Sequence, residues 1–93
     1  MKKIERKLEK YFKLTREALE KVEIKKLRSK KMKEIAEDFI DMAKRYYYDA
    51  KYFKEKGDLI TALAAISYAH AWLDAGARIG VFKTKDSRLF AAD

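Results

Sequence analysis

The chain has 93 residues, of which 48% are hydrophobic and 41% are charged, and its formal net charge is +8. This length supports one small domain, and so many charged side chains must surround a thin core. The absence of cysteine excludes a disulfide framework, a thiolate metal site and a cysteine nucleophile.

No apolar run approaches the roughly 20 residues that a membrane span needs. The basic start of the chain is not followed by the apolar core of a signal peptide, so we expect a cytoplasmic protein without a membrane partner. Proline, asparagine and glutamine are also missing. Without proline, long helices can run unbroken, and the missing amides beside abundant Lys, Glu and Arg predict a heat-adapted source.

The positive charge is concentrated in the first third of the chain. Residues 1–34 hold 14 basic and 6 acidic residues, whereas residues 35–93 hold nine of each. The densest segment is KKLRSKKMK at 25–33. Its candidate phosphate contacts are Lys25, Lys26, Arg28, Lys30, Lys31 and Lys33. Such cations displace condensed counterions when they bind a nucleic acid. We favour the other interpretation, a solvated connection between helices that its charge keeps soluble, because a basic run without a recognisable motif is a permissive signal.

The first predicted helix covers about residues 3–23. Apolar and small side chains recur there at three- and four-residue steps, which indicates one buried helix face. This face contains Ile4, Leu8, Tyr11, Thr15, Ala18, Leu19 and Val22. A basic connection over about 24–29 follows.

The second predicted helix covers about 30–56 and the third about 59–79. Ser29 has the side chain of an N-cap. Gly57 suits the left-handed position that ends a helix, and Asp58 caps the next helix at once. Gly80 ends the third helix in the same way, and a C-terminal tail occupies 81–93, with Leu89 and Phe90 as its candidate anchors.

These elements predict a single all-α domain over residues 1–93. We expect an up-and-down antiparallel three-helix bundle with a tight Gly57–Asp58 hairpin between the second and third helices. The first helix should pack across the groove of that hairpin, because each amphipathic face is too small to be stable alone.

The third helix is apolar on most of its circumference, which is typical of a helix that is buried on more than one side. Opposite its core stripe lie Tyr68, Trp72 and Ile79. With Tyr48 and Tyr52 of the second helix, these rings predict one aromatic surface. Its candidate roles are a homodimer contact, a partner site or a platform for bases, and the alternative is that the first helix or the tail covers it.

A polar cluster lies on the same two helices. Ser67, His70 and Asp74 fall within two turns and contain the residue types of a nucleophilic triad, with Asp49 as a further candidate. One straight helix does not supply the cleft and oxyanion site that catalysis needs. We therefore favour a buried histidine tied to Asp74, and expect no catalytic residue, metal or cofactor.

Residues 46–80 closely resemble an archaeal family known as domain of unknown function number 357. The resemblance is carried by a long ordered motif. The motif contains Tyr47, Asp49, Phe53, Gly57, Asp58, Ala62, SYAH at 67–70, WLDAG at 72–76 and Gly80. Ala71 stands where glycine is usual in the family.

The resemblance implies an archaeal source and a three-helix bundle, and it implies no activity. It marks six positions on which a shared function would depend. These are Asp49, Ser67, Tyr68, His70, Trp72 and Asp74.

The leading functional hypothesis is a non-catalytic interaction module that self-associates, with a dimer favoured, or binds a protein partner through the aromatic face. The alternative is a nucleic-acid-binding protein that uses residues 25–33. A weaker alternative is a small-ligand or enzymatic site around Ser67, His70 and Asp74.

Overall fold

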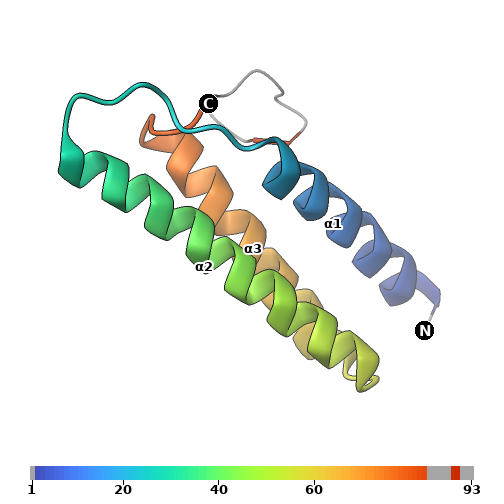
Figure 1. Cartoon of the computed structure of the whole chain (residues 1–93). Helices are drawn as coiled ribbons and strands as arrows, with labels where there is room; N and C mark the ends of the chain where they lie inside the picture. The colour runs from blue at the N-terminus through green and yellow to red at the C-terminus, as the bar shows by residue number, and fades with distance from the viewer. Residues whose placement is uncertain (1, 84–88, 91–93) are drawn as a thin grey trace.

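Three antiparallel helices make up the computed structural model, which describes residues 2–83, 89 and 90 (Figure 1). They are α1 (Lys2–Lys21), α2 (Lys30–Glu55) and α3 (Leu59–Arg78). The predicted all-α three-helix bundle is confirmed. The helices α2 and α3 form the closest pair, and α1 packs mainly on α3.

The turn between α2 and α3 follows from its local chemistry. Gly57 adopts a φ of +82°, which places it in the left-handed region, and the Asp58 N–H donates to the Phe53 carbonyl at 2.9 Å. The carboxylate of Asp58 then accepts from the Thr61 N–H at 3.1 Å and caps α3. Hydrogen bonding by the Thr61 side chain and, second, by its backbone N–H holds the pKa of Asp58 below its ordinary value. The cap is therefore stabilising at neutral pH and is lost as pH falls through this lowered pKa.

Ser29 caps α2 as predicted, since its hydroxyl accepts from the Met32 N–H at 3.2 Å. At the other end of the bundle, Gly80 adopts a φ of +84°. The Val81 N–H donates to the Gly76 carbonyl at 3.0 Å, which completes the cap of α3.

Alanines bring α2 and α3 close together along their length. Ala36, Ala43 and Ala50 of α2 are fully buried, as are Ala62 and Ala69 of α3. The larger buried side chains divide into two clusters, one at each end of the bundle. One cluster contains Leu73, Val81, Phe82, Leu89 and Phe90, and the other contains Leu8, Phe12 and Ile66.

The face of α1 differs from the prediction at one position. Phe12 is 8% exposed, whereas Tyr11, which the periodicity assigned to the core, is 37% exposed. Tyr11 and Phe12 both lie three or four residues from Leu8 and from Thr15, so the spacing alone is compatible with either residue in the core. The rotation of α1 selects Phe12, because its ring packs edge-on against Tyr47 of α2, with the centroids 5.7 Å apart.

The connection between α1 and α2 pairs with the segment that follows α3. The Lys25 N–H donates to the Val81 carbonyl at 2.8 Å, and the Lys83 N–H donates to the Glu23 carbonyl at 2.9 Å. Because residue 23 takes part in this pairing, α1 ends at Lys21, two residues earlier than predicted. Leu89 and Phe90 are buried in the adjoining cluster, as expected of anchors, while the rest of the tail beyond Lys83 lies outside the described residues.

A substitution at Gly76 tests the packing at this end of the bundle. A Cβ at Gly76 would overlap the Phe82 side chain, so we expect Gly76→Ala to lower the free energy of unfolding by about 1–3 kcal/mol, which is the usual cost of overpacking. Urea denaturation followed by circular dichroism measures the change. Trimming the ring with Phe82→Leu should recover part of the loss in the Gly76→Ala background, and an unchanged stability of Gly76→Ala alone would contradict the packing.

Candidate functional site

The outer side of α3 carries a row of exposed side chains that we call the α3 seam. The seam consists of Ile60, Ala64, Tyr68, Ala71, Ala75 and Ile79. Its steps are four, four, three, four and four residues, so the six side chains follow one face of the helix for about 28 Å. Ile60, Tyr68 and Ile79 are 67%, 60% and 52% exposed. Rows at such steps are the side-chain ridges through which helices pack.

A shallow apolar hollow of about 330 Å³ lies at the middle of the seam. It is lined by Tyr46, Tyr68, Ala71, Trp72 and Ala75. Tyr68 stacks on Tyr46 of α2, with the ring centroids 5.3 Å apart. Trp72 is half-buried and packs edge-on against Phe39, with the ring centroids 4.9 Å apart. The hollow is therefore bordered by aromatic rings that pack against α2, and the methyl groups of Ala71 and Ala75 complete its lining.

Two of the five predicted interface residues lie elsewhere. Tyr48 and Tyr52 are exposed on α2, but a step of two residues turns a helix by about 200°. Tyr48 therefore points to nearly the opposite side of α2 from Tyr46, which contacts Tyr68. The expectation of one continuous aromatic surface is wrong in this respect, and the α3 surface consists of Tyr68, Trp72 and Ile79 with the small residues between them.

His70 links α3 to α1. Its Nδ1 lies 3.1 Å from Oγ1 of Thr15, which is fully buried, and its Nε2 lies 3.6 Å from the Asp74 carboxylate. A neutral imidazole has one donor and one acceptor nitrogen. A proton on Nε2 would face Asp74 and leave Nδ1 to accept from Thr15. The histidine is half-buried rather than buried as we favoured, its Nε2 faces Asp74 beyond hydrogen-bond distance, and Thr15 is a partner that the sequence did not reveal.

The structure does not assemble a nucleophilic triad. The Ser67 hydroxyl is exposed and donates to the Leu63 carbonyl at 2.8 Å, within its own helix. The two ring nitrogens of His70 face Thr15 and Asp74. Asp49 is exposed on α2 and is neither of these partners. The four residues of the predicted polar cluster therefore do not form one site.

The basic stretch divides between two structural elements. Lys25, Lys26 and Arg28 lie in the connection, whereas Lys30, Lys31 and Lys33 belong to the first turn of α2, and all six are exposed. This first turn contains no acidic residue. Cations are unfavourable there, because the helix dipole places partial positive charge at the N-terminus.

Among the described residues, no group of three or more His, Cys, Asp and Glu side chains is placed to hold a metal ion. Within the same residues, no helix is both long and apolar enough to cross a membrane.

A family model described as protein of unknown function (DUF357) matches residues 10–82, which is well over half of the chain. The chain belongs to the DUF357 family. The region matched to DUF357 contains the α3 seam, the Thr15–His70 contact and the basic stretch. No curated protein and no solved structure gives a significant match. The DUF357 description assigns no activity.

Proposed function

We propose that this DUF357 chain is a non-catalytic interaction module that forms a homodimer through the α3 seam. The observation that carries the proposal is the row of six exposed apolar side chains along the whole of α3. In its 20 residues α3 has two charged side chains, Asp74 and Arg78. A helix that is apolar around most of its circumference is stable in water when a second surface covers it.

The seam is complementary to a second copy of itself. Its spacing reads the same in both directions, so an antiparallel copy related by a two-fold axis would meet it residue for residue. Ile60 would face Ile79 of the second copy, and Ala64 would face Ala75. At the centre, Tyr68 would face Ala71, which lines the apolar hollow. A two-fold interface requires such self-complementarity, and we therefore choose a second copy over an unrelated partner.

The test is the oligomeric state of a double variant. Tyr68→Ser with Ile79→Ser should convert a dimer into a monomer in analytical ultracentrifugation, because it removes a ring and an aliphatic side chain from the seam. Both residues are more than half exposed, so the fold should persist.

The matched control is Tyr48→Ser with Tyr52→Ser. It removes a similar amount of exposed apolar surface from the outer side of α2 and should leave the dimer intact. A native chain that is monomeric at high concentration would refute the proposal, and so would an equal loss of association in both double variants.

A second candidate function is nucleic-acid binding through residues 25–33. The observation that favours it is the conflict at the start of α2, where Lys30, Lys31 and Lys33 oppose the helix dipole. A phosphate backbone would relieve this repulsion. Replacing all six cations of the stretch with glutamine should then weaken RNA or DNA binding and flatten its salt dependence; unaltered binding would refute this candidate.

The composition supports a further proposal about habitat. The absence of asparagine, glutamine and cysteine fits a heat-adapted source, and we propose an archaeal, cytoplasmic protein.

A further inference from the structure

A groove runs between α1 and α2, on the side of the bundle where these two helices make few contacts. Three adjoining hollows of about 600, 610 and 460 Å³ lie along it. The first and second share Arg6 and Glu9, the second and third share Phe12 and Arg16, and Lys54 lines all three. The groove exists because α1 leans on α3 and leaves its other flank open.

Cations dominate the walls of this groove. Five of them lie at three- and four-residue steps on one face of α1, namely Lys2, Arg6, Lys10, Lys13 and Arg16. Lys51 and Lys54 face them from α2. Three carboxylates, from Glu5, Glu9 and Glu55, also line the hollows. The lining therefore carries a net charge of +4, spread over about 21 Å of α1.

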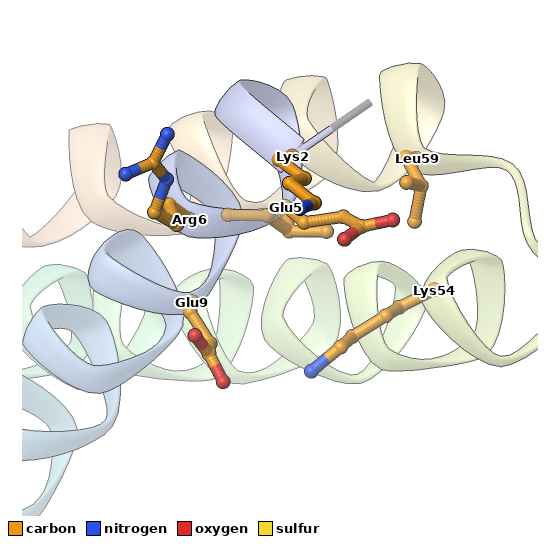
Figure 2. A pocket seen from close by; sticks show the side chains of 7 residues that line it. Lys2, Glu5, Arg6, Glu9, Lys54 and Leu59 are labelled. Carbon is orange, nitrogen blue, oxygen red and sulfur yellow. The ribbon is translucent and has the colours of Figure 1, made fainter.

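The floor of the groove is aromatic. Phe12 and Tyr47 meet edge to face there, and Lys54 Nζ lies 5.1 Å from the centre of the Phe12 ring. Figure 2 shows Lys54 extending from α2 toward α1, where Lys2, Glu5 and Glu9 lie, while the guanidinium of Arg6, which also lines the hollow, points away from Lys54. Long cations thus border a strip in which the ring of the half-buried Tyr47 is accessible, whereas Phe12, at 8% exposure, belongs to the core beneath it.

We propose that this groove binds a single strand of nucleic acid. A charged groove that follows the backbone, with aromatic rings for the bases, is the usual design for single-strand binding. The hollows are open and continuous, and the cations are distributed along them, so they suit an extended polyanion better than a compact phosphorylated metabolite. About 21 Å is the length of roughly six nucleotides at the ~3.4 Å spacing of a stacked strand, and an extended strand places fewer nucleotides along it.

This site is separate from the basic stretch 25–33. The groove is lined mainly by α1 and the C-terminal part of α2. The stretch 25–33 lies in the connection and the first turn of α2, at the other end of that helix (Figure 1). The groove is also independent of the α3 seam, because none of the groove residues belongs to the seam. Neither the proposed dimer nor the second candidate function is needed for it.

The experiment is fluorescence anisotropy of a labelled oligouridylate of about 12 nucleotides, a length within the usual site sizes, over a salt series. The groove variant carries Arg6→Gln, Lys13→Gln and Lys51→Gln. The matched control carries Lys3→Gln, Lys7→Gln and Lys44→Gln, which are exposed cations outside the hollows. A third variant has the six cations of 25–33 replaced by glutamine. Thermal denaturation confirms that each variant is folded.

We expect the native chain to bind, and the groove variant to bind about 100-fold more weakly at 0.1 M salt. The slope of log affinity against log salt concentration should be smaller in magnitude by ~2 in the groove variant. This follows if each of the three cations contacts one phosphate of a single strand. The matched control should change far less, although its net charge falls by the same amount.

Four results would overturn the assignment. The first is that the native chain does not bind the oligouridylate. The second and third are that the groove variant and its control lose affinity equally, or that only the 25–33 variant loses affinity. The fourth is that the native chain binds polyglutamate of the same charge equally well. Equally tight binding of a duplex of the same length would refute the preference for a single strand.

Discussion

Ala64→Lys and Ala75→Glu are each expected to weaken self-association of the chain, and mixing the two variants is expected to restore it. In the antiparallel arrangement, residue 64 of one copy faces residue 75 of the other. Each single variant therefore places an unpaired charge against a methyl group. We expect a cost on the order of 2 kcal/mol, which is about a 30-fold rise in Kd. In the mixture the two new charges face each other and form an ion pair.

The measurement is sedimentation equilibrium of each variant and of their equimolar mixture. Both alanines are exposed on α3, so the variants should keep the helix and the core. The discriminating control is a mixture of Ala64→Lys with Ala64→Glu. That mixture should stay dissociated in an antiparallel dimer, and its recovery in place of the first would show a parallel one.

Local signals in the sequence were sufficient to predict the ends of the helices that have capping residues. Ser29, Gly57, Asp58 and Gly80 all take the cap positions assigned to them, since a cap depends on the chemistry of a few neighbouring residues. The bounds of α2 and α3 accordingly differ from the predicted ones by one residue at the C-terminal end of each. The end of α1 was less well predicted, because a segment 60 residues away pairs with it.

Surfaces were harder to predict than helices, because they depend on how each helix is rotated against its neighbours. Periodicity placed Tyr68 and Trp72 on the outer side of α3, but it did not determine which tyrosine of α2 would lie beside them. Tyr46 takes that place, and Tyr48 points away. The signal for the seam was nevertheless present in the four-residue steps from Ile60 to Tyr68 and from Ala71 to Ile79.

The groove between α1 and α2 shows the same limitation. Arg6, Lys10 and Lys13 follow helical spacing. The densest positive charge, however, lies at 25–33, and the predicted phosphate contacts were therefore placed there. A helical stripe of cations is ordinarily a solvated face. It borders a groove here because α1 packs on α3 and leaves α2 partly uncovered on that side.

Thr15 and His70 form a polar contact between the two apolar clusters of the core. On α1, Thr15 lies between Phe12 of one cluster and Ala18 of the other; on α3, His70 lies between Ala69 and Leu73. Apolar side chains tolerate a shift of one helix along another, but a hydrogen bond between two side chains does not. We therefore expect this contact to fix the position of α1 along α3.

Thr15→Val is expected to lower the free energy of unfolding by about 1–3 kcal/mol, because it keeps the shape of the side chain and leaves Nδ1 of His70 without its partner. Thr15→Val with His70→Leu should recover most of that loss, since no nitrogen is then left unsatisfied, and Asp74 can hydrogen-bond water because a third of its side chain is exposed. The matched control is Ser67→Ala, which also removes one hydroxyl from the same region and should change stability by less than about 0.5 kcal/mol. Urea denaturation of the four proteins decides the matter: if Thr15→Val costs no more than Ser67→Ala, the contact does not stabilise the bundle.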